Sequence, residues 1–172
     1  METEVLKLAV VMHRKPLASR WQPYQWQPAE VLLDQGLPVG APRCLRDDAD
    51  DMRWLFTGFE LRLYSDEAEG YFLNLDSRAP CWFVMSRLEE IDGVEVAVPR
   101  TVTLSYNEAA RLMDGGEQVD TVPAPGLIVE RLMEFAQAYY RPEPKRKRRK
   151  PSFEGGAAVD QMAKAEGQRH GG

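Results

Sequence analysis

The 172-residue chain has few of the residues that most often bind metals: two cysteines and two histidines. There is no CxxC pair, and His170 lies near the C-terminus, so a zinc site would have to join Cys44, Cys81 and His13 from distant segments. We expect free thiols in a reducing compartment instead, with a single disulfide as the alternative, and Cys81 as a small core residue beside Trp82. The chain therefore predicts no metal site and no cofactor.

Long hydrophobic runs are also missing. The first apolar stretch, Leu6–Met12, contains Lys7 and follows two glutamates, so it lacks the basic start and the length of a signal peptide. No window approaches the roughly 18 to 20 apolar residues that span a membrane. We expect a cytoplasmic protein without a membrane span.

The common catalytic motifs are absent too: there is no G-x-S-x-G, Walker loop, G-x-G-x-x-G or H-E-x-x-H. A nucleophile needs a base, and His13 is the single histidine of the first 140 residues. Gly115-Gly116 follows a predicted helix, which is typical of a helix stop rather than a phosphate loop. Glu89-Glu90 is expected to be exposed charge. We therefore predict no catalytic residue and a protein that is not an enzyme.

What the chain does contain is enough apolar material for one domain, with 44% hydrophobic residues and 4 Trp, 6 Tyr and 6 Phe. The net charge of −5 divides unevenly along the chain. Residues 1–140 hold 13 Lys and Arg against 23 Asp and Glu, whereas residues 141–172 hold 9 against 4. We predict a compact acidic domain over residues 1–140 and a disordered basic tail over 141–172.

The first half of the domain is expected to be mostly extended. Residues 5–13 predict a strand, and the prolines of residues 16–28 favour an extended, irregular segment. A short second strand is expected at 29–33. Residues 34–53, rich in Gly, Pro and Asp, are interpreted as a loop with a mobile acidic part.

Residues 54–104 predict an antiparallel meander, because apolar and polar residues alternate and the spacers are short. YFLNLD, at 71–76, is interpreted as one of its strands. Asp92-Gly93 is a strong hairpin signal.

Two helices should follow. Ser105 and Glu108 have capping-box spacing at the start of the first helix, and apolar residues at helical spacing predict the second over 126–140. The expected fold class is α+β: an antiparallel sheet or small barrel of about six strands followed by two helices, with the disordered basic C-terminal tail.

The segment WQPYQWQP is the most unusual local feature. Its aromatic residues Trp21, Tyr24 and Trp26 could form a stacking surface for a sugar, a base or a peptide. Alternatively, the two tryptophans cap the hydrophobic core from a loop.

The basic run KRKRRK consists of six consecutive cations: Lys145, Arg146, Lys147, Arg148, Arg149 and Lys150. Such a run can bind nucleic acid, anionic lipid or an acidic protein surface, or it can serve only as a solubilising tail. The acidic body of the chain argues against nucleic acid, because it would repel phosphate.

Four stretches together resemble a bacterial family, domain of unknown function 3305, found mostly in proteobacteria: LAVVMHRKPLASRWQPYQWQP, GFELRLYSDEAEGYFLNLDSRAPCWFVMSRLEE, VTLSYNEA and EFAQAYYRPEPKRKRRK. The resemblance covers about residues 5–150. It implies a gene near those of formate dehydrogenase, a molybdenum-dependent enzyme system, and it implies no activity or catalytic residue.

These observations favour a non-catalytic accessory protein for formate dehydrogenase, acting in assembly, maturation or stability of the enzyme through protein contacts. Trp21, Tyr24 and Trp26 would form the contact surface, and Lys145–Lys150 would steer the protein toward an acidic partner such as a formate dehydrogenase subunit. The alternative is a nucleic-acid-binding regulator that uses the basic tail and the aromatic segment. A third hypothesis, a small enzyme, requires a pocket where Cys81, His13 or paired acids converge.

Overall fold

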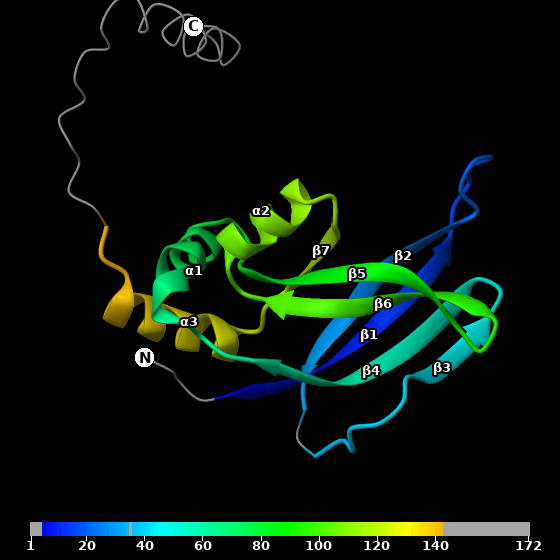
Figure 1. The fold of residues 1–172 in the computed structure, drawn as a ribbon, viewed down its shortest axis with the longest axis horizontal. Helices are drawn as coiled ribbons and strands as arrows, with labels where there is room; N and C mark the ends of the chain where they lie inside the picture. The colour runs from blue at the N-terminus through cyan, green and yellow to red at the C-terminus, as the bar shows by residue number, and fades with distance from the viewer. Residues whose placement is uncertain (1–4, 35, 143–172) are drawn as a thin grey trace, which may run out of the picture. The chain divides into compact units, whose positions relative to one another are not determined.

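The computed structural model describes residues 5–34 and 36–142, so the predicted tail lies outside the described residues apart from its first two positions. Within the described ranges the chain forms seven strands and three α-helices, and the helices lie at one end of the strands (Figure 1). The elements are β1 (Leu6–Pro16), β2 (Tyr24–Leu33), β3 (Arg43–Asp48), β4 (Asp51–Leu61), α1 (Ala68–Leu75), β5 (Cys81–Ile91), β6 (Val94–Thr103), α2 (Tyr106–Asp114), β7 (Gln118–Pro123) and α3 (Gly126–Tyr139).

The first four strands form one antiparallel sheet in the order β2-β1-β4-β3. Along β1, alternate residues point to opposite faces, and Leu8, Val10 and Met12 are completely buried in the main core. Their neighbours Ala9 and Val11 form a smaller apolar cluster with Leu55. Because both faces of β1 are covered in this stretch, the sequence there is almost continuously apolar.

The second sheet has the order β6-β5-β7, and all its pairs are antiparallel. Its β5–β6 hairpin turns at Asp92-Gly93, where both residues have positive φ angles of 50° and 81°. A two-residue turn of this kind matches the twist of the flanking strands, and Asp-Gly is a preferred pair for it. The hairpin prediction is confirmed.

The two predicted helices are present as α2 and α3. At the start of α2, the Ser105 hydroxyl accepts a hydrogen bond from the Glu108 backbone N–H (3.1 Å). The reciprocal half of the capping box is missing, because the Ser105 N–H donates to Thr103 Oγ1 instead. In α3, Ile128, Leu132, Phe135 and Ala136 are buried at the predicted helical spacing.

The prediction of one sheet or barrel of about six strands is wrong in three respects. The strands form two open sheets, and β3 occupies part of the predicted loop 34–53. β7 is a further strand that the sequence did not indicate. β3 resembles a loop in sequence because all six of its residues are exposed at a sheet edge, where charged side chains are common.

The interpretation of residues 71–76 as a strand is also wrong, because they belong largely to α1. Ala68, Tyr71 and Leu75 lie on the covered side of this helix at helical spacing. The expected irregular segment 16–28 likewise includes the last residue of β1 and the first half of β2, and Pro16 pairs with Tyr24. Pro28 is tolerated in β2 because this strand is at the edge of its sheet and the pairing shifts beside it.

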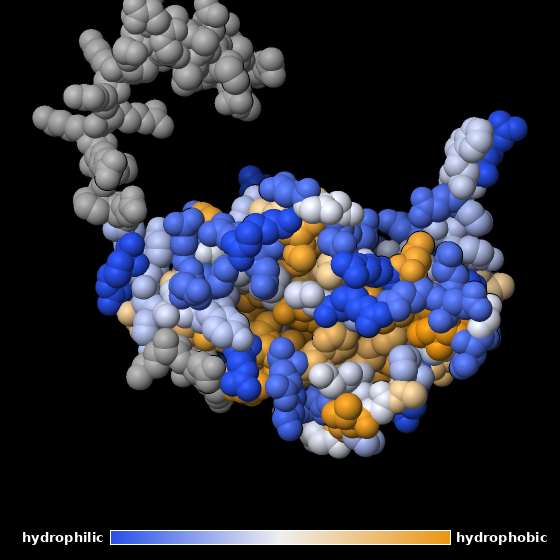
Figure 2. Space-filling view, viewed as in Figure 1, coloured by the Kyte–Doolittle hydropathy of each residue, from blue (hydrophilic) through white to orange (hydrophobic). Residues whose placement is uncertain are grey.

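α1, α3 and strands of both sheets share one hydrophobic core, in which Trp82 is completely buried. Figure 2 shows hydrophobic side chains in a band across the middle of one face, with hydrophilic side chains on both sides of it. Among residues 5–34 and 36–142, no helix is long and apolar enough to cross a membrane.

Candidate functional site

A groove of about 870 Å³ lies between the two sheets, lined by the end of β1, the start of β2 and residues of β5, β6 and β7. We call it the inter-sheet groove. Its size is within the range of ligand and peptide sites in proteins. Its lining residues are Arg14, Trp21, Gln22, Pro23, Tyr24, Gln25, Trp26, Ser86, Leu88, Glu95, Ala97 and Gln118.

The groove begins where the inner face of β1 changes from apolar to charged. Two residues beyond the buried Met12, on the same face, the side chain is Arg14. Arg14 lies directly opposite Trp26 across the β1–β2 pair. An arginine without an acidic partner is costly to enclose in a dry core, and the Arg14 side chain lines the groove at the margin of the core, next to Met52 and Trp26.

Arg14 is held in place by an aromatic ring rather than by an acid. Its guanidinium carbon lies 4.0 Å from the centre of the Tyr24 ring, a cation–π contact. Its Nε is buried and has no hydrogen-bond partner within the described part of the chain. The groove therefore contains a positioned cation with a donor that is not used.

The second sheet supplies the opposite wall. Leu88 on β5 pairs with Ala97 on β6, and both line the groove. The Leu88 side chain is 58% exposed even though it follows Trp82 and Val84 on the same face of β5, which are completely buried. Glu95 is the acidic residue among those that line the groove. This wall therefore contains two apolar side chains, Leu88 and Ala97, and one acidic side chain, Glu95.

The structure brings the predicted contact residues Trp21, Tyr24 and Trp26 together along this groove. Trp21 is 92% exposed near the tip of the β1–β2 hairpin, which projects from the body (Figure 1), and Tyr24 is also exposed. Trp26 is half-buried and packs against the main core. Each of the two readings of this segment therefore applies to part of it. The predicted contact run Lys145–Lys150 lies outside the described residues.

Comparison with protein-family models matches residues 7–149 to the family described as "Protein of unknown function (DUF3305)". The match spans most of the chain and includes both the aromatic segment and most of the basic run. The chain belongs to the DUF3305 family. The resemblance seen in the sequence is thereby confirmed as family membership. No curated protein and no solved structure gives a match to this chain.

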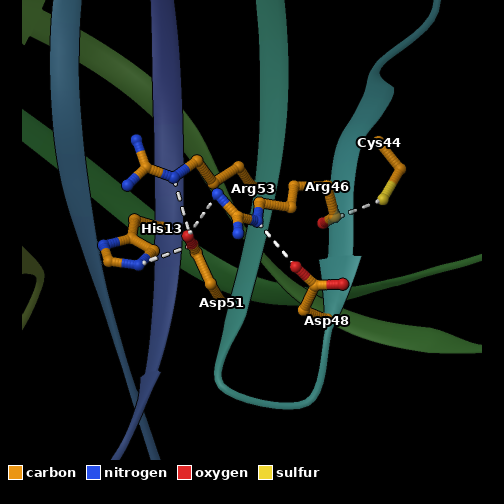
Figure 3. A network of polar contacts seen from close by, with 6 residues as sticks. All are labelled: His13, Cys44, Arg46, Asp48, Asp51 and Arg53. Atoms are coloured by element: carbon orange, nitrogen blue, oxygen red, sulfur yellow. Dashed lines mark hydrogen bonds and ion pairs between the residues drawn. The ribbon is translucent and has the colours of Figure 1, made fainter.

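This DUF3305 chain has a second polar constellation, on the face of the first sheet opposite to Arg14 (Figure 3). The Asp51 carboxylate accepts hydrogen bonds from His13 Nε2 (2.8 Å) and Arg53 Nε (3.0 Å). Arg46 approaches the same carboxylate at 3.3 Å and also contacts Asp48 at 2.7 Å. The network joins β1, β4 and β3 next to the β3–β4 turn.

The protonation states in this network follow from burial and from the neighbouring charges. Burial lowers the pKa of His13, and the Arg53 and Lys15 charges act in the same direction, which together outweigh the Asp51 carboxylate. His13 is therefore neutral near pH 7 and donates Nε2–H to Asp51. Partial desolvation would raise the pKa of Asp51, but the hydrogen bond from Arg53 and the positive charges around it lower it overall. The Asp51 carboxylate is therefore ionised and paired with side chains of three strands, so its role is to hold these strands together.

The residues considered for a zinc site or a nucleophilic site do not converge in this DUF3305 structure. Cys44 lies in register with Trp54 and Met12, one row away from His13, so strand alternation directs the two side chains to opposite faces. Cys81 belongs to the other sheet, and burial raises the pKa of its thiol, which disfavours the reactive thiolate. Over the described residues, no group of three or more His, Cys, Asp or Glu side chains is placed to hold a metal ion.

The acidic pair Glu89-Glu90 also fits a surface role. Glu89 forms an ion pair with Arg100, and Glu90 lies opposite Glu95 across the β5–β6 hairpin. Sequence reasoning missed Arg14 and Leu88 as groove residues. One signal was available for Arg14, because the alternation Leu8, Val10, Met12 places a charged residue next on the core-facing side.

Proposed function

We propose that this DUF3305 protein is a non-catalytic accessory protein that binds a partner protein through the inter-sheet groove. The observation that carries the proposal is the position of Trp21, Tyr24 and Trp26 along one open groove that also contains Arg14. Tryptophan, tyrosine and arginine are the residues most enriched where protein–protein binding energy concentrates.

The arrangement suits recognition better than chemistry. The Arg14 guanidinium lies over the Tyr24 ring, and the described residues that line the groove include no histidine or cysteine. An exposed Trp21 on a projecting hairpin adds apolar area that becomes useful only when a second surface covers it. These features support a contact surface of the kind that binds a segment of another protein.

For the partner, we propose the formate dehydrogenase system, with a role in assembly, maturation or stability of the enzyme in the cytoplasm. This part of the proposal rests on the genomic setting that the family resemblance implies. The basic residues Lys145–Lys150, all but the last of them inside the range that matches the family, would supply attraction toward an acidic subunit.

The test is a tagged pull-down of the full chain from its native host, with formate oxidation measured in a deletion strain. Formate dehydrogenase subunits should be enriched with the wild-type chain and lost with Trp21→Ala, a change that removes a side chain that is 92% exposed. The matched control is Leu127→Ala, which removes an exposed apolar side chain on α3, outside the groove. No enrichment together with normal formate oxidation in the deletion strain would contradict the proposal.

A nucleic-acid-binding regulator is the competing function, and the exposed Trp21 and Tyr24 rings could stack on bases. A titration of the full chain with single-stranded and duplex DNA against salt separates the two functions. Phosphate contacts through the basic run predict binding that weakens steeply with ionic strength and disappears on truncation at Arg141. Absence of binding at low salt excludes this function and leaves the protein partner.

A further inference from the structure

The inter-sheet groove contains one cation that the fold does not neutralise. Several other arginines of the described chain are paired with acids, among them Arg53 with Asp51 (3.0 Å), Arg87 with Glu117 (2.8 Å) and Arg111 with Glu67 (2.6 Å). Arg14 has the Tyr24 ring beneath it and a buried Nε without a hydrogen-bond partner among the described residues. A buried donor left without an acceptor costs free energy, and a carboxylate that draws the half-buried Arg14 side chain toward the groove would recover that cost.

The Tyr24 ring covers one side of this cation, with the Arg14 guanidinium carbon 4.0 Å from the ring centre. A guanidinium is planar and presents its N–H groups at its edges, where a carboxylate can accept two parallel hydrogen bonds. Trp26 lies directly opposite Arg14 across the strand pair and also lines the groove. The site therefore combines one anion position with an adjacent apolar position.

The strands that line the groove favour an extended occupant. The lining residues come from the β1–β2 hairpin on one side and from β5, β6 and β7 on the other, so the groove runs between strands. An extended segment has the same two-residue repeat as these strands. In an extended segment every second side chain points the same way, so one side chain can reach Arg14 while the next faces the other wall.

The charge distribution favours a single carboxylate over a polyanion. Glu95 is the acidic residue among those that line the groove, and it comes from the β5–β6 hairpin in the opposite wall. Glu90 lies across the strand pair from it. A polyphosphate backbone would therefore meet repulsion at this wall, whereas a peptide with one acidic side chain would not.

We infer that the inter-sheet groove binds an extended peptide segment of the partner protein, with an Asp or Glu side chain paired to Arg14 and a neighbouring large apolar side chain against Trp26 and Leu88. The inference rests on the proposed function for the existence of a protein partner, and adds the chemistry by which that partner is recognised. Arg14 is the specificity-determining residue of this site.

The test begins with a random octapeptide phage library selected on the full-length protein. Enriched peptides should carry an acidic residue next to a large apolar one. A fluorescein-labelled synthetic copy of an enriched peptide should then bind the wild-type chain and lose about tenfold or more in affinity to Arg14→Gln, as expected for a hydrogen-bonded charge. Changing the acidic residue of that peptide to Lys should abolish binding to the wild type and restore it to Arg14→Glu.

Two further variants separate this recognition from a loss of folding. Arg100→Gln removes a paired arginine outside the groove and should leave peptide affinity unchanged. Glu95→Gln should leave binding of the acidic peptide unchanged or strengthen it. Enrichment of peptides without an acidic residue, or equal affinity of the wild type and Arg14→Gln, would overturn the inference.

The outcomes also separate this inference from the proposed function. If no peptide is enriched but the pull-down still recovers a partner in a Trp21-dependent manner, the extended-segment inference fails and the proposed function stands. If acidic peptides bind through Arg14 but no formate dehydrogenase subunit is recovered, the groove chemistry stands and the proposed partner fails. Displacement of the peptide by single-stranded DNA of equal charge would favour the nucleic-acid function.

Discussion

The two ends of this α+β domain differ in the setting of one polar side chain at each. At the end that carries the helices, which we call the closed end, Asn74 is 1% exposed and its side chain hydrogen-bonds to three backbone groups. At the other end, which we call the open end, the Nε of Arg14 has no partner among the described residues, and the half-buried side chain lines a groove. Trp82 Nε1 also has no partner among the described residues, but Trp82 is completely buried in the core, where a ligand does not reach it. The Asn74 hydrogen bonds stabilise the fold, whereas Arg14 can meet a ligand. Substitutions should therefore change stability at the closed end and binding at the open end.

The largest effect on stability is expected for Asn74→Ala. Asn74 Nδ2 donates to the carbonyls of Cys81 (2.8 Å) and Leu104 (2.9 Å), and Oδ1 accepts from the Cys81 N–H (3.1 Å). Removing it leaves these groups without partners in the core, so the free energy of unfolding should fall by about 3 kcal/mol. Equilibrium unfolding in urea measures the change.

The control for Asn74→Ala is Asn107→Ala. Asn107 also donates a side-chain hydrogen bond, but to the exposed carboxylate of Glu69 (3.1 Å), so its loss should cost no more than about 0.5 kcal/mol. Equal unfolding midpoints for the two variants would show that the closed end does not depend on the buried amide.

A smaller loss of stability is expected for Gly70→Ala, at the contact between α1 and the start of α2. A Cβ at position 70 would lie 2.1 Å from Ser105 Oγ, which also donates to Glu67 Oε2 (2.5 Å). The overlap forces Ser105 away from its helix-capping position, and the free energy of unfolding should fall by about 2 kcal/mol.

A double-mutant cycle isolates this contact. Ser105→Ala alone should cost about 1 kcal/mol through loss of the cap. In the double variant with Gly70→Ala, the free energy of unfolding should fall by clearly less than the sum of the two single losses, because Ser105 Oγ is no longer there to overlap the added methyl group. If the two losses in free energy of unfolding are strictly additive, the methyl group added at position 70 does not overlap Ser105.

The His13–Asp51 pair in the first sheet predicts that the folding stability of the protein depends on pH. The pKa of His13 is lower in the folded protein than its ordinary value of 6.5, so the unfolded chain binds this proton more readily. Its contribution to stability is therefore complete above pH 6.5 and is lost as the pH falls through that value toward the folded pKa. Urea midpoints at pH 5.0 and 7.5 should differ less for His13→Gln than for the wild type. If the urea midpoints of His13→Gln and the wild type change equally with pH, the lowered pKa of His13 in the folded protein is contradicted.

The smallest change in stability is expected at the open end. Arg14→Gln should alter the free energy of unfolding by no more than about 0.5 kcal/mol, since no ion pair is lost. Arg111→Gln, which breaks the 2.6 Å pair with Glu67 at the closed end, should cost up to about 1 kcal/mol. A large loss of stability in Arg14→Gln would show that the groove arginine is structural, which would remove the contrast between the two ends.

Much of the local structure was predictable from the sequence, and α1 shows where this stopped. α2, α3 and the β5–β6 turn were predicted because their signals lie within a few residues: a serine cap, a helical apolar repeat and an Asp-Gly pair. The short α1 was misread as a strand because its apolar residues fit both periods over so few positions. Its helical form is stabilised by Asn74, whose partner Leu104 lies 30 residues later in the sequence.

The candidate site was likewise predictable from the sequence only in part. Trp21, Tyr24 and Trp26 were identified from composition alone, because three large aromatics between prolines are unusual. The opposite wall was not foreseeable, since Leu88 and Glu95 lie on a hairpin whose position over the first sheet depends on the packing of the core.

The order of residues was sufficient for the features that depend on near neighbours: family membership, the acidic charge of residues 1–140, two capped or periodic helices and one tight hairpin. Three features depended on the folded chain: the division into two sheets, the helical form of α1 and the groove around Arg14. The physical reason is that each of these arises from contacts between residues distant in sequence. Their free energy comes from shared burial and hydrogen bonding, which no local pattern encodes.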